Sequence, residues 1–293
     1  MSVIDPHTDV GKRPPPWDEY WTFGWLLLVL LLYLIPAVIL ALVFKVDYRS
    51  GGGLVWIIVL HAVQIGAVTL LARLADWPAK EYLGLVRPNG RDTVIAIVSV
   101  ALFIPAWYAL AFVLEIHSSQ TYDSYRNAQA VGILALYWFV AVVVAPVAEE
   151  IVFRGFLFRG LTGHSQIIAS FTTSLVWALT HVGMAWSMKL QVVLLGLLLG
   201  WMRWRSGSVV LPILMHGLWN LWVLLRIAYI LDQAAARGLA GGACSHRISS
   251  IRCGADNICP SRKTKPAPMS ALRVLSGLVV LTLSLVNHDP EQT

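Results

Sequence analysis

The sequence predicts an all-α, polytopic membrane protein, a bundle of seven or eight transmembrane helices with a buried polar site. Hydrophobic residues make up 57% of the 293 positions and charged residues only 13%, with a mean hydropathy of +0.68. A globular domain usually has about 25% charged residues. The apolar residues also form repeated runs, and about 17 to 25 of them in a helix cross a hydrocarbon core of about 30 Å.

Seven apolar runs predict membrane spans. The first is longer than the core of a signal peptide, about 7 to 15 residues, and no small-residue cleavage site follows it, so we interpret it as an anchor. An eighth run, 272–286, is short and carries Arg273 near its start, so it is a span, an interfacial helix or neither. The seven predicted spans lie near residues 23–44, 54–74, 94–116, 131–155, 167–186, 190–204 and 209–230.

The chain divides into an N-terminal segment, 1–22, a transmembrane domain, 23–231, and a C-terminal extension, 232–293, that holds the eighth run. The net charge is +6 and the pI about 9.4, but the basic residues lie mostly in loops, on one face if the spans alternate. The positive-inside rule makes that face cytoplasmic, with the N-terminus on it. We therefore expect a multi-pass protein of the cell membrane that binds the lipid bilayer and no nucleic acid.

The extension does not fit this topology, because residues 232–270 are polar and basic and simple alternation puts them on the outer side. Either one span is a re-entrant hairpin or the tail is a poorly structured extension. Its cysteines, Cys244, Cys253 and Cys259, match no zinc knuckle or CxxC motif, so we assign them no role. One disulfide with a free thiol is the alternative if the tail is extracytoplasmic.

Acidic and basic side chains inside the fourth predicted span indicate a functional site, because each costs roughly 2.5 to 3.5 kcal/mol at the bilayer centre. Glu150 and Arg154 are four residues apart, so they share one helix face and can neutralise each other. Glu149 points about 100° away and, if it is left unpaired beside a like charge, suits a general acid or base. The alternative is that all three form one buried ion network that only holds helices together.

Two other spans carry histidines at a similar depth. His216 and Asn220 are four residues apart and form a donor pair on one face, and His181 lies in the preceding motif-bearing span. Counted from the expected cytoplasmic ends, Glu149, His181 and His216 lie about 15, 22 and 16 Å deep at a rise of about 1.5 Å per residue. Each histidine alone is also consistent with a helix-bridging hydrogen bond, which we favour for His61 beside Gln64.

These motifs resemble the CPBP family, the CAAX prenyl protease 2 and bacteriocin-processing (Abi) intramembrane proteases. The first family motif is two glutamates, three residues and an arginine, present in "EEIVFR". The second is phenylalanine, three residues and histidine, and here "WALTH" has Trp177 in place of the phenylalanine. The third is histidine, three residues and asparagine or aspartate, present in "HGLWN". Order, spacing and membrane context agree over residues 131–222.

The resemblance implies an intramembrane endopeptidase that cuts a membrane-associated protein or peptide. Glu149 and His181 would activate water, His216 and Asn220 would donate hydrogen bonds to the oxyanion, and Glu150 and Arg154 would orient the first glutamate. Glu149, His181 and His216 could also ligate Zn²⁺, two histidines and a carboxylate being a known catalytic set, although a metal-free glutamate mechanism uses the same residues.

Two other functions fit the same residues. A proton-coupled transporter uses buried glutamate and histidine chains, but it would be expected to show an inverted repeat, which the sequence lacks. A non-catalytic membrane scaffold would use them for packing alone. Within the protease hypothesis, prenylated CAAX proteins and leader or bacteriocin-related peptides are equally allowed as substrates.

Overall fold

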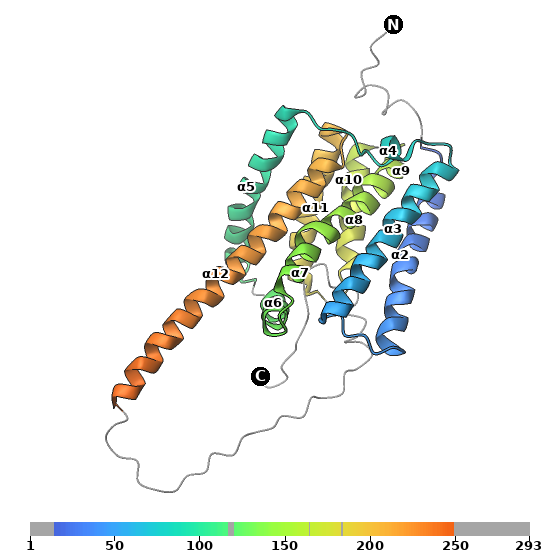
Figure 1. The fold of residues 1–293 in the computed structure, drawn as a ribbon. Coiled ribbons are helices and arrows are strands. Elements are labelled where there is room, and N and C mark those ends of the chain that lie inside the picture. Colours follow the sequence, from blue (N-terminus) through green and yellow to red (C-terminus); the bar gives the residue numbers. More distant parts are fainter. Residues whose placement is uncertain (1–14, 117–119, 164, 183, 249–293) are drawn as a thin grey trace.

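The computed structural model describes residues 15–116, 120–163, 165–182 and 184–248, and all regular elements within these ranges are helical (Figure 1). The predicted all-α fold is therefore confirmed for this part of the chain. In chain order the elements are α2 Glu19–Leu42, α3 Gly51–Leu74, α4 Ala79–Tyr82, α5 Gly90–Val113, α6 Gln120–Ala130, α7 Leu134–Phe139, η1 Val140–Val144, α8 Ala145–Glu150, η2 Ile151–Leu157, α9 Phe158–Leu161, α10 Gln166–Thr180, α11 Trp186–Ser206 and α12 Val210–Ile248.

Five of the described helices are long and apolar enough to cross a membrane: α2, α3, α5, the continuous run Leu134–Leu161, and α12 as far as Gln233. The predicted spans 167–186 and 190–204 correspond to α10 and α11. Helix α10 has only 15 residues, and α11 carries a lysine and two arginines. The count of seven spans thus stays a prediction for these two helices, and the eighth run lies outside the described residues.

The last helix is longer than the sequence pattern predicted. Helix α12 does not stop near residue 231 but continues to Ile248, and Figure 1 shows its C-terminal half extending away from the other helices. The predicted boundary between the transmembrane domain and the extension therefore does not coincide with a helix end. Of the three cysteines, Cys244 lies on this helix, and Cys253 and Cys259 lie outside the described residues.

Side-chain caps fix where four of the helices begin. Asp18 accepts a hydrogen bond from the backbone N–H of Trp21 at 2.9 Å, Ser50 from that of Gly53 at 3.1 Å, and Asn89 from that of Asp92 at 2.7 Å. Ser165 does the same for α10 at 3.3 Å. Such caps satisfy backbone donors that have no partner within the helix, so α2, α3, α5 and α10 begin at these positions.

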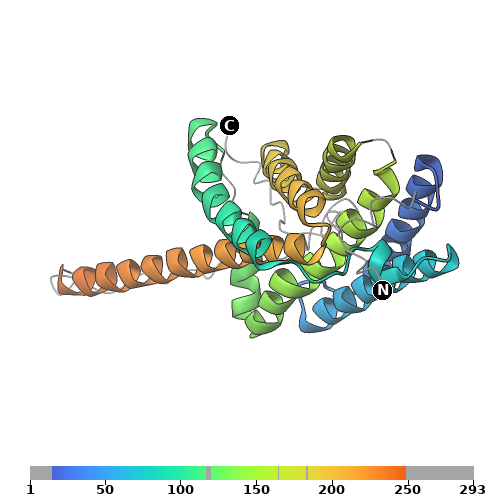
Figure 2. The same cartoon turned by 90° about the horizontal axis from the view of Figure 1, so that it is seen from above.

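The run from α7 to α9 is the central segment of the bundle. In Figure 2 it lies between α2 and α3 on one side and α10 and α11 on the other, and these helices all contact it. Two of its stretches, η1 and η2, are π-helical, which shifts backbone carbonyls away from their usual partners. Other helices bond to two of these carbonyls: Asn220 Nδ2 donates to Ala141 O at 2.8 Å, and Arg203 Nε donates to Arg154 O at 2.9 Å.

Helices α10 and α11 pack closely through small residues. A Cβ atom added to Gly196 would lie 2.8 Å from the Cβ of Ser174, and one added to Gly200 would lie 3.0 Å from the Cβ of Ser170. Small residues spaced four apart let membrane helices approach one another closely. This approach brings α11 against the polar residues of the central segment.

The loop before α5 fixes the junction between α11 and α12. Val209 donates its backbone N–H to Gly84 O at 2.8 Å, and Ser208 Oγ donates to Val86 O at 2.6 Å. Gly84 has φ +70°, and any Cβ there would overlap the guanidinium of Arg203. These bonds fix the start of α12 relative to the loop before α5, about two turns before His216.

Candidate active site

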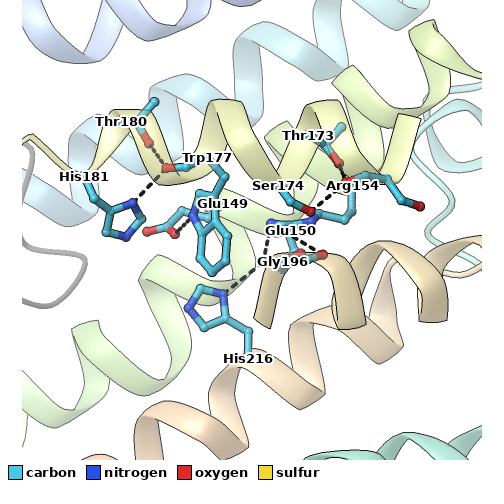
Figure 3. A network of polar contacts seen from close by, with 11 residues as sticks. Glu149, Glu150, Arg154, Thr173, Ser174, Trp177, Thr180, His181, Gly196 and His216 are labelled. Atoms are coloured by element: carbon cyan, nitrogen blue, oxygen red, sulfur yellow. Dashed lines mark hydrogen bonds and ion pairs between the residues drawn. The ribbon is translucent and has the colours of Figure 1, made fainter. Parts of the chain in front are cut away.

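Glu149 is buried in the central segment and is held by one oxygen. Trp177 on α10 donates its indole N–H to Glu149 Oε2 at 2.6 Å, and the two side chains are 2% and 7% exposed (Figure 3). The other oxygen, Oε1, is buried and has no hydrogen-bond partner among the described residues. This oxygen can therefore still accept a hydrogen bond or a proton, as a general base must.

His181 stands at the C-terminal end of α10, one turn after Trp177. Its Nδ1 lies 2.8 Å from the backbone carbonyl of Trp177, and its ring meets the indole edge-on at a centroid distance of 5.3 Å. A carbonyl can only accept, so Nδ1 carries the hydrogen in this bond. The neutral ring therefore keeps a lone pair on Nε2, which can accept a proton or a hydrogen bond.

His216 on α12 contacts the same indole at a centroid distance of 5.1 Å. Its Nδ1 lies 2.9 Å from Glu150 Oε1, which also accepts from Arg154. The carboxylate fixes the ring and would balance its charge if Nε2 were also protonated. Figure 3 shows His216 and Glu150 on one side of Trp177, whereas Glu149 extends toward the side on which His181 lies.

Arg154 completes the network and is fully buried. Its Nη1 lies 3.1 Å from Glu150 Oε1, so the predicted ion pair over one helical turn is confirmed. Its Nη2 donates to Gly196 O at 3.3 Å, and its guanidinium lies 4.5 Å from the centre of the Trp177 ring. The cation thus neutralises Glu150 within the central segment, and it links that segment to α11 by a hydrogen bond and to α10 by a cation–π contact.

Asn220 lies on α12, one turn after His216, but its amide is engaged elsewhere. One of its two N–H groups donates to Ala141 O, and its Oδ1 has no partner in the part of the chain that the structure describes. The structure therefore brings Glu149, Glu150, Arg154, His181 and His216 together around Trp177. Asn220 ties α12 to η1, with one N–H left over.

Sequence reasoning missed two members of this site. The sequence motif identifies Trp177 only as the residue in place of a phenylalanine, yet its indole N–H is the one donor to Glu149 among the described residues. Gly196 supplies the carbonyl that Arg154 reaches, and a Cβ on it would lie 2.9 Å from Arg154 Nη2. The signals that could have found them are the polar N–H that tryptophan adds and the GLLLG spacing on α11.

Residues 131–222 match the family model described as "Type II CAAX prenyl endopeptidase Rce1-like". This segment is an Rce1-like domain. It belongs to the CPBP family that the three motifs resemble, and it contains all six predicted site residues. No curated protein and no solved structure matches the chain. The chain also has five described helices long and apolar enough to cross a membrane, so it is an integral membrane protein.

The Rce1-like domain does not enclose the site alone. A cavity of about 200 Å³ lies beside Glu149, and its walls include Val152 and Phe153 of the domain. Leu30 and Leu34 of α2, and His61 and Gln64 of α3, line the same cavity. The N-terminal helices, which lie outside the matched segment, therefore form part of the space that adjoins the carboxylate.

The predicted zinc set is not gathered as ligands in this arrangement. Within the described ranges, no three His, Cys, Asp or Glu side chains are placed to hold a metal ion together. One oxygen of Glu149 is bonded to Trp177, and Nδ1 of each histidine is bonded to a carbonyl or carboxylate. Zinc binding stays a prediction from the residue types, and the chemistry proposed next uses the chain's own groups.

Proposed function

We propose that this chain is an intramembrane endopeptidase of the CAAX-protease type, which hydrolyses a peptide bond of a membrane-associated protein or peptide. The observation that carries the proposal is Glu149: it is buried, one oxygen is fixed by Trp177 and the other has no partner among the described residues. An ionisable group kept at such a cost inside a membrane bundle is a functional group by default. The Rce1-like domain supports the same reaction class.

In the proposed reaction, one water molecule lies between Glu149 Oε1 and His181 Nε2. Both atoms can accept a hydrogen from that water, because Oε1 is unpaired and the Nδ1–H of His181 is already bonded to Trp177 O. As the water oxygen bonds to the peptide carbonyl carbon, its proton passes to Glu149. General-base assistance of this kind contributes about 10²- to 10⁴-fold to a rate.

The carbonyl oxygen becomes an oxyanion in this step and needs donors. His216 can supply Nε2–H as an imidazolium, whose charge Glu150 would balance, and Asn220 has one N–H not used by Ala141. Fixed donors aimed at a developing charge in a dry site are worth about 2.7 to 4 kcal/mol each by analogy with other oxyanion holes. The carbon–nitrogen bond then breaks as Glu149 returns the proton to the leaving nitrogen, which gives a free amine and a new carboxyl group.

Glu150 and Arg154 are proposed to position these groups without touching the substrate. Glu150 fixes His216 through Nδ1, and Arg154 neutralises Glu150 and packs on Trp177. Trp177 in turn fixes Glu149. This chain of contacts joins the central segment, α10, α11 and α12, so the geometry of the reacting groups depends on all four.

The test compares protein termini in membranes from cells that express the wild-type chain, Glu149→Gln or Glu81→Gln. Glu81→Gln is the matched control, since it makes the same change on the exposed surface of α4. We expect new termini in membrane-associated proteins with the wild type and with Glu81→Gln, and their loss with Glu149→Gln at equal amounts of folded protein. Identical termini in all three would overturn the proposal and leave the scaffold or transporter function.

A further inference from the structure

The cavity beside Glu149 has a second polar wall, which the reaction above does not use. His61 and Gln64 lie one turn apart on α3, and His61 Nδ1 lies 3.0 Å from Gln64 Oε1. Both side chains are buried and line the cavity, and the ring of Tyr33 packs on His61 at 5.0 Å. The pair therefore faces the same cavity as the carboxylate of Glu149, but from α3 and not from the central segment.

The bond between the two side chains fixes what they can offer a ligand. Gln64 Oε1 only accepts, so His61 Nδ1 carries the hydrogen and the neutral ring presents Nε2 as an acceptor. The amide nitrogen of Gln64 remains as a donor. No other hydrogen bond of either side chain lies among the described residues. An acceptor beside a donor matches a peptide group, which offers one N–H and one C=O.

Apart from Thr180 and the ring of Tyr33, the rest of the cavity wall is apolar. Leu30 and Leu34 come from α2, and Val152 and Phe153 from the central segment. A volume of about 200 Å³ corresponds to roughly six or seven waters at about 30 Å³ each. This is room for one uncharged amino-acid side chain together with the peptide group that carries it.

We propose that this cavity is the subsite for the substrate residue next to the cleaved bond. The His61–Gln64 pair binds the peptide group of that residue, and the leucine-lined part takes its apolar side chain. The inference rests on the proposed function, which it deepens: α2 and α3, outside the Rce1-like domain, set which residue is accepted.

The first test fills the apolar part of the cavity. Leu34→Trp places a large ring among the lining residues, whereas Leu32→Trp makes the same change on the outward face of α2, where Leu32 is 38% exposed. Protein termini that depend on Glu149 are collected for both variants, and the residues flanking each cut are compared. We expect Leu34→Trp to shift the preference to smaller residues and Leu32→Trp to leave the wild-type preference. The same preference in both variants would overturn the proposal.

The second test removes the polar wall and stays informative if Leu34→Trp fails to fold. A synthetic peptide that spans one Glu149-dependent cut is assayed with purified Gln64→Leu and His61→Phe protein. Losing one hydrogen bond to the peptide group should lower kcat/KM about tenfold, mainly through KM. Unchanged kcat/KM in both variants would refute the subsite and leave the protease intact. If no terminus depends on Glu149, the protease function itself fails and the subsite with it.

Discussion

The first span and the central segment are both apolar helical runs of about the same length, yet they differ in hydropathy, burial and helix type. Helix α2 has a mean hydropathy of 2.9 over its most apolar window, and 22% of that window is buried. The run Leu134–Leu161 has a mean hydropathy of 1.9, with 61% buried. Helix α2 is α-helical throughout, although Pro36 lies inside it, whereas π-helical turns interrupt the central segment twice.

The difference shows that a helix facing lipid and a helix buried in the bundle have different requirements. A helix that mostly faces lipid needs only apolar side chains and satisfied backbone hydrogen bonds, and an ordinary α-helix provides both. A helix surrounded by others can carry charges, because neighbouring helices neutralise and bind them. The π-turns belong to the second kind of helix, since their displaced carbonyls are bonded by Arg203 and Asn220 from outside the segment.

Loss of the buried cation should have the largest effect on stability. Arg154→Met would leave Glu150 as an uncompensated charge in the core, which typically costs about 3 to 5 kcal/mol. The free energy of unfolding, measured by titration with a denaturing detergent, should fall by this amount. Arg49→Met, in the exposed loop after α2, is the matched control and should leave it unchanged. Equal stability of the two variants would mean that the central segment does not depend on its ion pair.

Removal of one N–H should lower activity while the fold is kept. Trp177→Phe keeps a ring between the two histidines but deletes the donor to Glu149, and hydrogen bonds to charged groups are worth about 1.5 to 3 kcal/mol. We expect kcat to fall about 10- to 100-fold with little change in KM. Trp138→Phe makes the same replacement where the indole N–H is buried without a partner among the described residues, and it should keep full activity. Equal kcat for both would show that Trp177 acts only as a space-filling ring.

The close contact between α10 and α11 should tolerate no added methyl group. Gly196→Ala would put a Cβ 2.8 Å from that of Ser174, and overpacking of this kind costs about 1 to 3 kcal/mol. Gly66→Ala in α3 meets nothing within 4 Å, so it should be neutral or slightly stabilising. Thermal unfolding of the two proteins in detergent checks the difference. A melting temperature for Gly196→Ala at or above that of Gly66→Ala would contradict the packing described.

The smallest effect is expected on the lipid-facing side of the first span. Leu28 is 43% exposed on α2, so Leu28→Ala removes few contacts and should change the free energy of unfolding by no more than about 0.5 kcal/mol. The denaturing-detergent titration used for Arg154→Met would measure it. A loss comparable to that of Gly196→Ala would indicate that α2 has a partner on this face.

Local features of the site could be predicted from the sequence, and features that depend on helix rotation could not. The Glu150–Arg154 pair follows from four-residue spacing along one continuous helical run, and it forms even though Arg154 lies in the π-helical stretch η2. The link between Trp177 and Glu149 joins two helices and depends on their relative rotation. The hydrogen bond from Asn220 to Ala141 O could not be predicted either, because it depends on the π-turn in η1.

Membrane spans could likewise be predicted from the sequence for some helices and not for others. Uniformly apolar runs such as α2 and α3 are recognised by composition alone. Helix α10 is short and α11 carries three basic residues, so composition gives little evidence on whether they span the membrane. The cavity pair on α3 was interpreted as a helix-bridging contact, since nothing in the sequence shows that His61 and Gln64 share a cavity with a glutamate from another span.

The most direct test of the whole account is whether Glu149 and His181 act on the same water. Glu149→Gln, His181→Gln and the double variant are assayed with one synthetic peptide that spans a Glu149-dependent cut, after unfolding measurements show that all three fold. Groups that act as a unit are strongly non-additive, so each single variant should lose about 10³-fold in kcat and the double variant no more than either. If the fold-loss in kcat of the double variant equals the product of the two single losses, Glu149 and His181 do not act on the same water.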